Sequence, residues 1–193
     1  LPATAALLIS SEEITSALFG YGSFDIFSVK NSANALFYFA LGLPAFALIK
    51  VFSSFLFARH NTKIPFYFSF FSVVINIFIS LYFFEKIGFI IIPIATTISS
   101  WLNSLLLFVY LISKKYFFFR SYFFSSFIKI VITTFITTYV FYYLVNFFEN
   151  YLIYESNYKL ITIILLVIVT FILYILLSIV TKAFKISDIK LKY

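Results

Sequence analysis

The chain has 193 residues, of which 63% are hydrophobic, 24% aromatic and only 11% charged. Soluble domains carry about 25% charged residues, so this composition excludes an ordinary soluble fold and predicts an all-α, polytopic transmembrane bundle. The sequence has no cysteine and a single histidine, His60, which excludes thiolate and histidine-rich metal sites. The net charge of +7 would suggest a nucleic-acid partner in a soluble protein, but here the loops account for it.

Long apolar runs predict about six membrane-spanning helices, the first of them truncated. The chain has no methionine and begins inside an apolar run, so we expect the C-terminal part of a longer protein whose N-terminal portion is missing. The predicted helices cover residues 1–19, 33–58, 65–84, 89–112, 123–147 and 160–181. We expect residues 1–112 to form one set of spans, residues 113–181 two further spans, and residues 182–193 a tail.

Basic residues gather in alternate loops. Nine of them fall on one predicted side, with one acid, Asp188; the nine are Arg59, Lys63, Lys114, Lys115, Arg120, Lys182, Lys185, Lys190 and Lys192. The other side has three basic residues, Lys30, Lys86 and Lys159. Because short cytoplasmic loops are rich in lysine and arginine, the 59–65 turn, the 113–120 connector and the C-terminus are predicted to be cytoplasmic. Glu12 and Glu13 are then expected at the outer interface.

The second predicted helix contains a break and a charge. Gly42 and Pro44 interrupt it, and because Pro44 has no N–H, the carbonyl of Ala40 is left free and a kink is expected. Lys50 follows at a depth where a charge costs about 2.5–3.5 kcal/mol on insertion scales. Two interpretations are open: Lys50 attracts an anionic headgroup within a cavity, or its side chain reaches back to the interface.

The third and fourth predicted helices each carry a polar stripe. The first stripe is Ser69, Ser72, Asn76 and Ser80, and the second is Thr96, Ser99 or Ser100, and Asn103. In an antiparallel hairpin Asn76 and Thr96 lie at similar depth, so the stripes are expected to face each other. They either pack through interhelical hydrogen bonds or form a cation pocket with Asn76, Ser80 and Thr96 as oxygen donors.

Four short motifs, at residues 18–24, 41–51, 58–65 and 101–103, together resemble the MurJ/MviN family of lipid II flippases. Residues 18–24 are similar to its LF-x-x-G-x-F turn, and residues 41–51 to its GLPAF…KV helix. The stretch ARHNTKIP at 58–65 resembles its A-x-x-D-T-K-T-P turn, with Asn61 in place of Asp, and Trp101-Leu102-Asn103 resembles its A-W-L-N element. The motifs cover residues 1 to about 110, and the last two helices match in hydropathy alone.

The resemblance implies helices 9 to 14 of a fourteen-helix exporter fold. It implies a transporter and not an enzyme: alternating access would carry lipid II, or another undecaprenyl-pyrophosphate-linked sugar, across the bacterial cytoplasmic membrane for peptidoglycan synthesis. Gly42, Pro44 and Lys50 would line the substrate path, the last two helices would hold the lipid tail, and Arg59, Thr62, Lys63 and Pro65 would form a cytoplasmic turn. No cofactor is expected, and sodium or proton coupling stays open.

Two alternatives are kept. One is an O-antigen or capsular polysaccharide lipid flippase of the same superfamily. The other is a membrane-embedded glycosyl- or acyltransferase, which would need a catalytic acid or histidine at a membrane face. The one candidate histidine, His60, lies in the turn that the flippase motif already explains.

Overall fold

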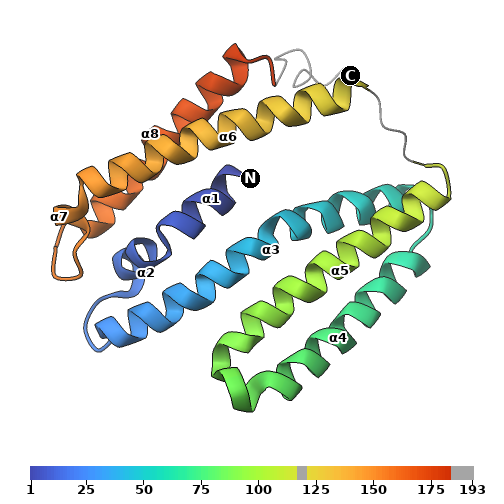
Figure 1. Ribbon diagram of the computed structural model, residues 1–193, viewed down its shortest axis with the longest axis horizontal. Helices are drawn as coiled ribbons and strands as arrows, with labels where there is room; N and C mark the ends of the chain where they lie inside the picture. Colours follow the sequence, from blue (N-terminus) through green and yellow to red (C-terminus); the bar gives the residue numbers. More distant parts are fainter. Residues whose placement is uncertain (117–120, 184–193) are drawn as a thin grey trace. The chain divides into compact units, whose positions relative to one another are not determined.

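The structure, a computed structural model, describes residues 1–116 and 121–183 and is all-helical over those residues. The helices are α1 (Pro2–Ile9), α2 (Ser11–Phe19), α3 (Ile26–Ala58), α4 (Lys63–Ile87), η1 (Gly88–Ile90), α5 (Ile91–Ser113), α6 (Ser121–Phe147), α7 (Glu149–Leu152) and α8 (Lys159–Val180) (Figure 1). The predicted tail beyond residue 183 lies outside the described residues, as does Arg120.

The predicted helical bundle is confirmed. Four runs in the described residues are long and apolar enough to cross a membrane, and one of them, Lys63–Ser113, contains both α4 and α5. The first predicted helix is interrupted, because Ser10 has φ −124° and ψ 35° and separates α1 from α2. At about 1.5 Å per residue neither piece is long enough to cross a bilayer. Pro65 is the third residue of α4, not the first as predicted, but its missing N–H is equally harmless in the first turn.

The chain divides into two compact units. Unit 1 consists of Leu1–Ala33 and Phe119–Tyr193, and unit 2 consists of Asn34–Phe118. The boundary falls inside α3. The predicted division at residues 112 and 181 concerns the lobes of a larger fold and stays a prediction.

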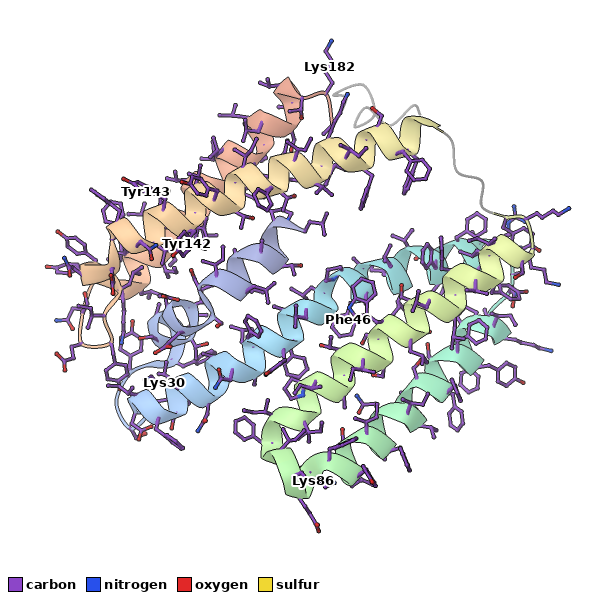
Figure 2. The ribbon with its side chains drawn as sticks, viewed as in Figure 1. Lys30, Phe46, Lys86, Tyr142, Tyr143 and Lys182 are labelled. Atoms are coloured by element: carbon purple, nitrogen blue, oxygen red, sulfur yellow. The ribbon has the colours of Figure 1, made fainter. Side chains whose placement is uncertain are left out.

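Unit 2 is built around the antiparallel pair of α4 and α5 (Figure 1). Gly88, with φ 75°, makes the turn between them, a conformation that favours glycine. Lys86 lies at this turn (Figure 2). At the other end of α5, Leu107 and Leu111 pack against Phe52 and Leu56 of α3, and this buried cluster holds α3 to the hairpin.

The core of unit 1 joins α2, α6, α7 and α8. Its buried members include Ala17, Phe141, Val145, Ile163 and Leu166. Helix α6 packs against α8, α1 against α6, and α2 against α8. Asp25 begins α3 by accepting a hydrogen bond from the backbone N–H of Ser28 at 2.8 Å, and the hydrogen bonds from Ser28 lower the pKa of Asp25 below its ordinary value.

The buried side chain of Lys159 bonds two loops of unit 1, the loop after α2 and the loop before α8. The Nζ of Lys159 donates to the carbonyls of Gly20 and Tyr154, each at 2.6 Å, and the side chain is 2% exposed. The same ammonium lies 4.4 Å from the ring centroid of Tyr21 and 4.5 Å from that of Tyr154. A Cβ on Gly20 would lie 3.2 Å from Nζ, so glycine lets the end of α2 approach this closely. Lys159 therefore ties the end of α2 to the start of α8.

We expect Lys159→Met to destabilise the protein by at least about 2 kcal/mol, because it leaves two carbonyls without their charged donor. Methionine keeps most of the length of the side chain, so the loss would reflect the ammonium and not its bulk. Thermal unfolding of the purified protein in detergent measures the effect. The matched control is Lys30→Met, which removes an exposed charge from the same unit. Equal unfolding temperatures for the two variants would contradict the role of Lys159.

Candidate functional site

Helix α3 runs without interruption from Ile26 to Ala58, through the predicted break at Gly42 and Pro44, and approaches α5 closely there. Pro44 lies inside α3 and is half-buried, whereas Gly42 is buried. A Cβ on Gly42 would lie 3.0 Å from the Oγ1 of Thr97, which is tight for a real contact. Thr97 Oγ1 donates to the carbonyl of Tyr38 at 2.6 Å, and Trp101 Nε1 donates to the carbonyl of Leu41 at 3.1 Å. The structure therefore supports the backbone around the break with polar side chains from α5.

These two donors were missed from the sequence. Trp101 was noted only as part of a motif, and Thr97 not at all. Their acceptors are backbone carbonyls about 60 residues earlier in the chain, so nothing in the local pattern marks the pairing.

Lys50 lies on α3 six residues after Pro44, and its side chain is exposed. Within the described parts of the chain it has neither a hydrogen-bond partner nor an ion-pair partner. It therefore differs from Lys159, whose charge is satisfied inside the protein. A free ammonium on a membrane-spanning helix is available to an anion, and its role in the substrate path stays a prediction.

The two polar stripes do face each other. The amide Nδ2 of Asn76 donates to Thr96 Oγ1 at 3.1 Å and to Ser99 Oγ at 3.3 Å. Farther along the hairpin Asn103 Nδ2 donates to Ser69 Oγ at 3.3 Å. The amide hydrogens of Asn76 are thus already engaged between the helices, as the packing interpretation requires.

Some oxygens along the stripes are unused. Ser80 Oγ and Asn103 Oδ1 are buried atoms with no hydrogen-bond partner. Thr96 Oγ1 also donates to the carbonyl of Ile92 at 2.8 Å. No group of three histidine, cysteine, aspartate or glutamate side chains in the described residues could hold a metal ion. Whether the stripes also bind a cation stays open, because the geometry shows packing contacts and unused oxygens together.

The basic turn after α3 packs against the end of α5. Arg59 lies over two aromatic rings, with its Cζ 4.8 Å from the Phe55 centroid and 4.1 Å from the Tyr116 centroid. Asn61 Nδ2 donates to the hydroxyl of Tyr110 at 3.2 Å, and Asn61 Oδ1 accepts from the backbone N–H of Ile64 at 3.4 Å. The 59–63 turn and the segment after α5 are therefore at one end of unit 2, as the charge pattern predicts.

The remaining members of the predicted turn motif have simpler positions. Thr62 precedes α4 as its N-cap residue and Lys63 is the first residue of that helix. Both side chains are exposed, whereas Pro65 is buried.

Helices α3 and α5 end in the same way: His60 (φ 58°) and Lys115 (φ 55°) adopt the left-handed conformation. The next N–H, of Asn61 or Tyr116, returns to the carbonyl of Leu56 or Leu111.

Long apolar helices, with Gly42 and Pro44 inside α3, an exposed lysine farther along that helix and a basic turn after it, define a polytopic membrane protein. The family model described as lipid II flippase MurJ matches residues 1–163, and the chain belongs to this family. The match extends beyond the sequence motifs through α6 and α7 to the first turn of α8.

Curated relatives carry the same family name. A probable lipid II flippase MurJ of Rhizobium meliloti is 41% identical over 112 residues, 58% of this chain and 21% of the relative. One from Rickettsia prowazekii is 37% identical over 110 residues, 57% of this chain and 22% of the relative. The lipid II flippase MurJ of Burkholderia cenocepacia is 30% identical over 108 residues, 56% of this chain and 21% of the relative. The chain thus matches about a fifth of the length of these relatives.

The polar stripes can be tested as a packing device. We expect Asn76→Ala to lower the unfolding temperature in detergent by an amount equivalent to about 1 kcal/mol, because it removes two interhelical hydrogen bonds. Ser80→Ala is the matched control, since its hydroxyl has no partner to lose. We also expect transport to be independent of sodium. A sodium dependence that disappears in Asn76→Ala or Thr96→Val would contradict packing alone and support the cation pocket.

Proposed function

We propose that the protein translocates lipid II, the lipid-linked peptidoglycan precursor, across the bacterial inner membrane. It acts as a transporter, not an enzyme, and the substrate moves by alternating access. The observation that carries this proposal is the match of the lipid II flippase family model to residues 1–163, which include the break and free lysine of α3. We propose no cofactor, and we assign no coupling ion.

Lys50 is the residue that we assign to the headgroup. A lipid-linked pyrophosphate is an anion, and an ammonium on a membrane-spanning helix attracts it strongly where water is scarce. The exposure of Lys50 and its lack of a partner in the described residues support this role. Gly42 and Pro44 would shape the path, because they let α3 bend beside α5.

The lipid tail would lie against the last two long helices. An apolar cavity of about 180 Å³ in unit 1 supports this assignment, and its lining includes Ala6, Thr137, Phe141, Val167 and Phe171 from α1, α6 and α8. Hydrocarbon fits such a surface because most of its lining is apolar and two of its hydroxyls, of Thr137 and Thr170, donate within their own helices. Thr137 donates to the carbonyl of Thr133 at 2.9 Å.

The basic loops support a cytoplasmic C-terminus. Arg59 and the residues just after α5 lie at one end of unit 2, and Lys86 lies at the other end (Figure 2). Lys182 lies just beyond the end of α8 (Figure 2). With more basic residues on the side of Arg59, that side would face the cytoplasm.

Cysteine labelling in intact cells tests this orientation, and the chain has no cysteine of its own. We expect single cysteines at Asn61, Ser113 and Ser187 to resist a membrane-impermeant thiol reagent. Cysteines at Ser23 and Ser156 should react, because their loops would lie outside the cytoplasm. Lysis before labelling provides the control, since all five positions should then react. Labelling of position 61 from outside would contradict the orientation.

Growth of a flippase-depleted strain tests the function. We expect Lys50→Gln, in the protein as the cell produces it, to reach normal membrane levels but to support growth poorly. Loss of a charge-assisted contact of about 1.5–3 kcal/mol weakens headgroup binding by roughly tenfold or more. Lys50→Arg should rescue growth in part, because it keeps the charge in a bulkier, forked group.

The matched control is Lys30→Gln, which removes an exposed charge from the same helix. Immunoblots from the same cultures measure abundance. Normal growth with Lys50→Gln at normal abundance would overturn the role of Lys50 in the substrate path. Failure of the unmodified protein to support growth would overturn the proposed function itself.

A further inference from the structure

Unit 1 contains a polar cavity that the proposed transport path does not use. It has a volume of about 280 Å³ and lies between α2, the start of α3, the end of α6, and α7 with the loop that follows it. Its polar lining comes from Glu12, Glu13, Ser16, Asn146, Glu149 and Tyr154. Each ionisable side chain among the lining residues is thus a carboxylate or a tyrosine, and none is basic.

One of the three carboxylates, Glu13, is affected by the other two. Burial raises the pKa of Glu13 above its ordinary value, and the negative charges of Glu12 and Glu149 raise it further. Glu12 and Glu13 are in the first turn of α2, and Glu149 is in the first turn of α7. Such positions stabilise each carboxylate singly, but they do not explain why acids from two separate helices share one cavity.

A second observation is independent of charge. Ser16 lines the cavity, is only 4% exposed, and its Oγ has no hydrogen-bond partner. Ser10 and Ser178 of the same unit are also buried without a partner, but neither lines this cavity. A buried hydroxyl without a partner beside three acids indicates a group that completes the site.

We propose that this cavity binds a hydrated divalent cation, with Mg²⁺ as its best match. The charged lining offers carboxylate oxygens only, which hard cations prefer, and no thiol or imidazole. No group of three histidine, cysteine, aspartate or glutamate side chains in the described residues could hold a metal ion by itself. The carboxylates would therefore not enclose the ion, which would keep much of its water shell. Mg²⁺ loses its water reluctantly and is commonly bound in this way. The bound ion would link α2 to α7 by neutralising their acids.

Thermal unfolding in detergent, with and without MgCl₂, tests the proposal. The comparison buffer contains NaCl at equal ionic strength, because salt alone screens repulsion between carboxylates. We expect Mg²⁺ to raise the unfolding temperature above the NaCl value, with half of the effect at about 0.1–1 mM, the range of weak oxygen sites. Ca²⁺ should act in the same direction.

Variants of the lining residues test whether the response of the unfolding temperature to Mg²⁺ arises in this cavity. Glu149→Gln should weaken the response to Mg²⁺ at least about tenfold, because it removes one unit charge beside a divalent ion. Without Mg²⁺ the same variant should unfold at or above the temperature of the unmodified protein, since repulsion is relieved; this excludes misfolding as the cause. Ser16→Ala should weaken the response less. The matched control is Glu155→Gln, an exposed acid of the neighbouring loop that does not line the cavity.

Three results would overturn the proposal. The first is an equal response to NaCl and MgCl₂ at matched ionic strength. The second is a response to Mg²⁺ that Glu149→Gln leaves unchanged. The third is a stronger response to propylammonium than to Mg²⁺, which would assign the cavity to an organic ammonium group. None of these results depends on transport, so the cation site and the proposed function can fail separately.

Discussion

Hydrocarbon offers no hydrogen-bond partners, and this constraint shapes the polar side chains of the long helices. Several of the serine and threonine side chains there donate to a carbonyl about one turn earlier, as Thr133 does to Lys129 and Thr170 to Leu166. Asparagine has no such local solution, and Asn76 and Asn103 instead donate across the α4–α5 hairpin. The same constraint fixes the register of the hairpin, because a shift of one residue would separate Asn76 from Thr96.

The lysines Lys159 and Lys50 meet this constraint in opposite ways. Lys159 is buried, and its cost is offset by two carbonyls and two aromatic rings supplied by the protein. Lys50 is exposed and has no partner in the described residues. A lysine that the protein satisfies is structural, whereas one left free on a membrane-spanning helix costs stability that only a ligand or the interface can offset. This contrast is the physical reason to assign the headgroup to Lys50.

Sequence patterns predicted the parts that depend on local chemistry. Apolar length predicted the four runs that could cross a membrane, which contain α3, α4 with α5, α6, and α8. The pairing of Asn76 with Thr96 follows from their distances to the turn. The break at Ser10 was missed because residues 1–19 were predicted to form one helix, although the apolar run ends at Ile9. The partners of Lys159 were missed for another reason. Backbone carbonyls leave no mark in a sequence, and Gly20 lies 139 residues away.

Tyr154 connects the two charged features of unit 1. Its carbonyl accepts from Lys159, its hydroxyl donates to the carbonyl of Phe24 at 2.7 Å, and its side chain lines the acidic cavity. The ammonium of Lys159 is directed at carbonyls and rings, and within the described residues it forms no ion pair with the carboxylates of the cavity. Removing Lys159 would also move Tyr154 and with it the wall of the cavity. A change at Glu149 alters the charge alone, and for this reason it separates cation binding from the stability of the loops.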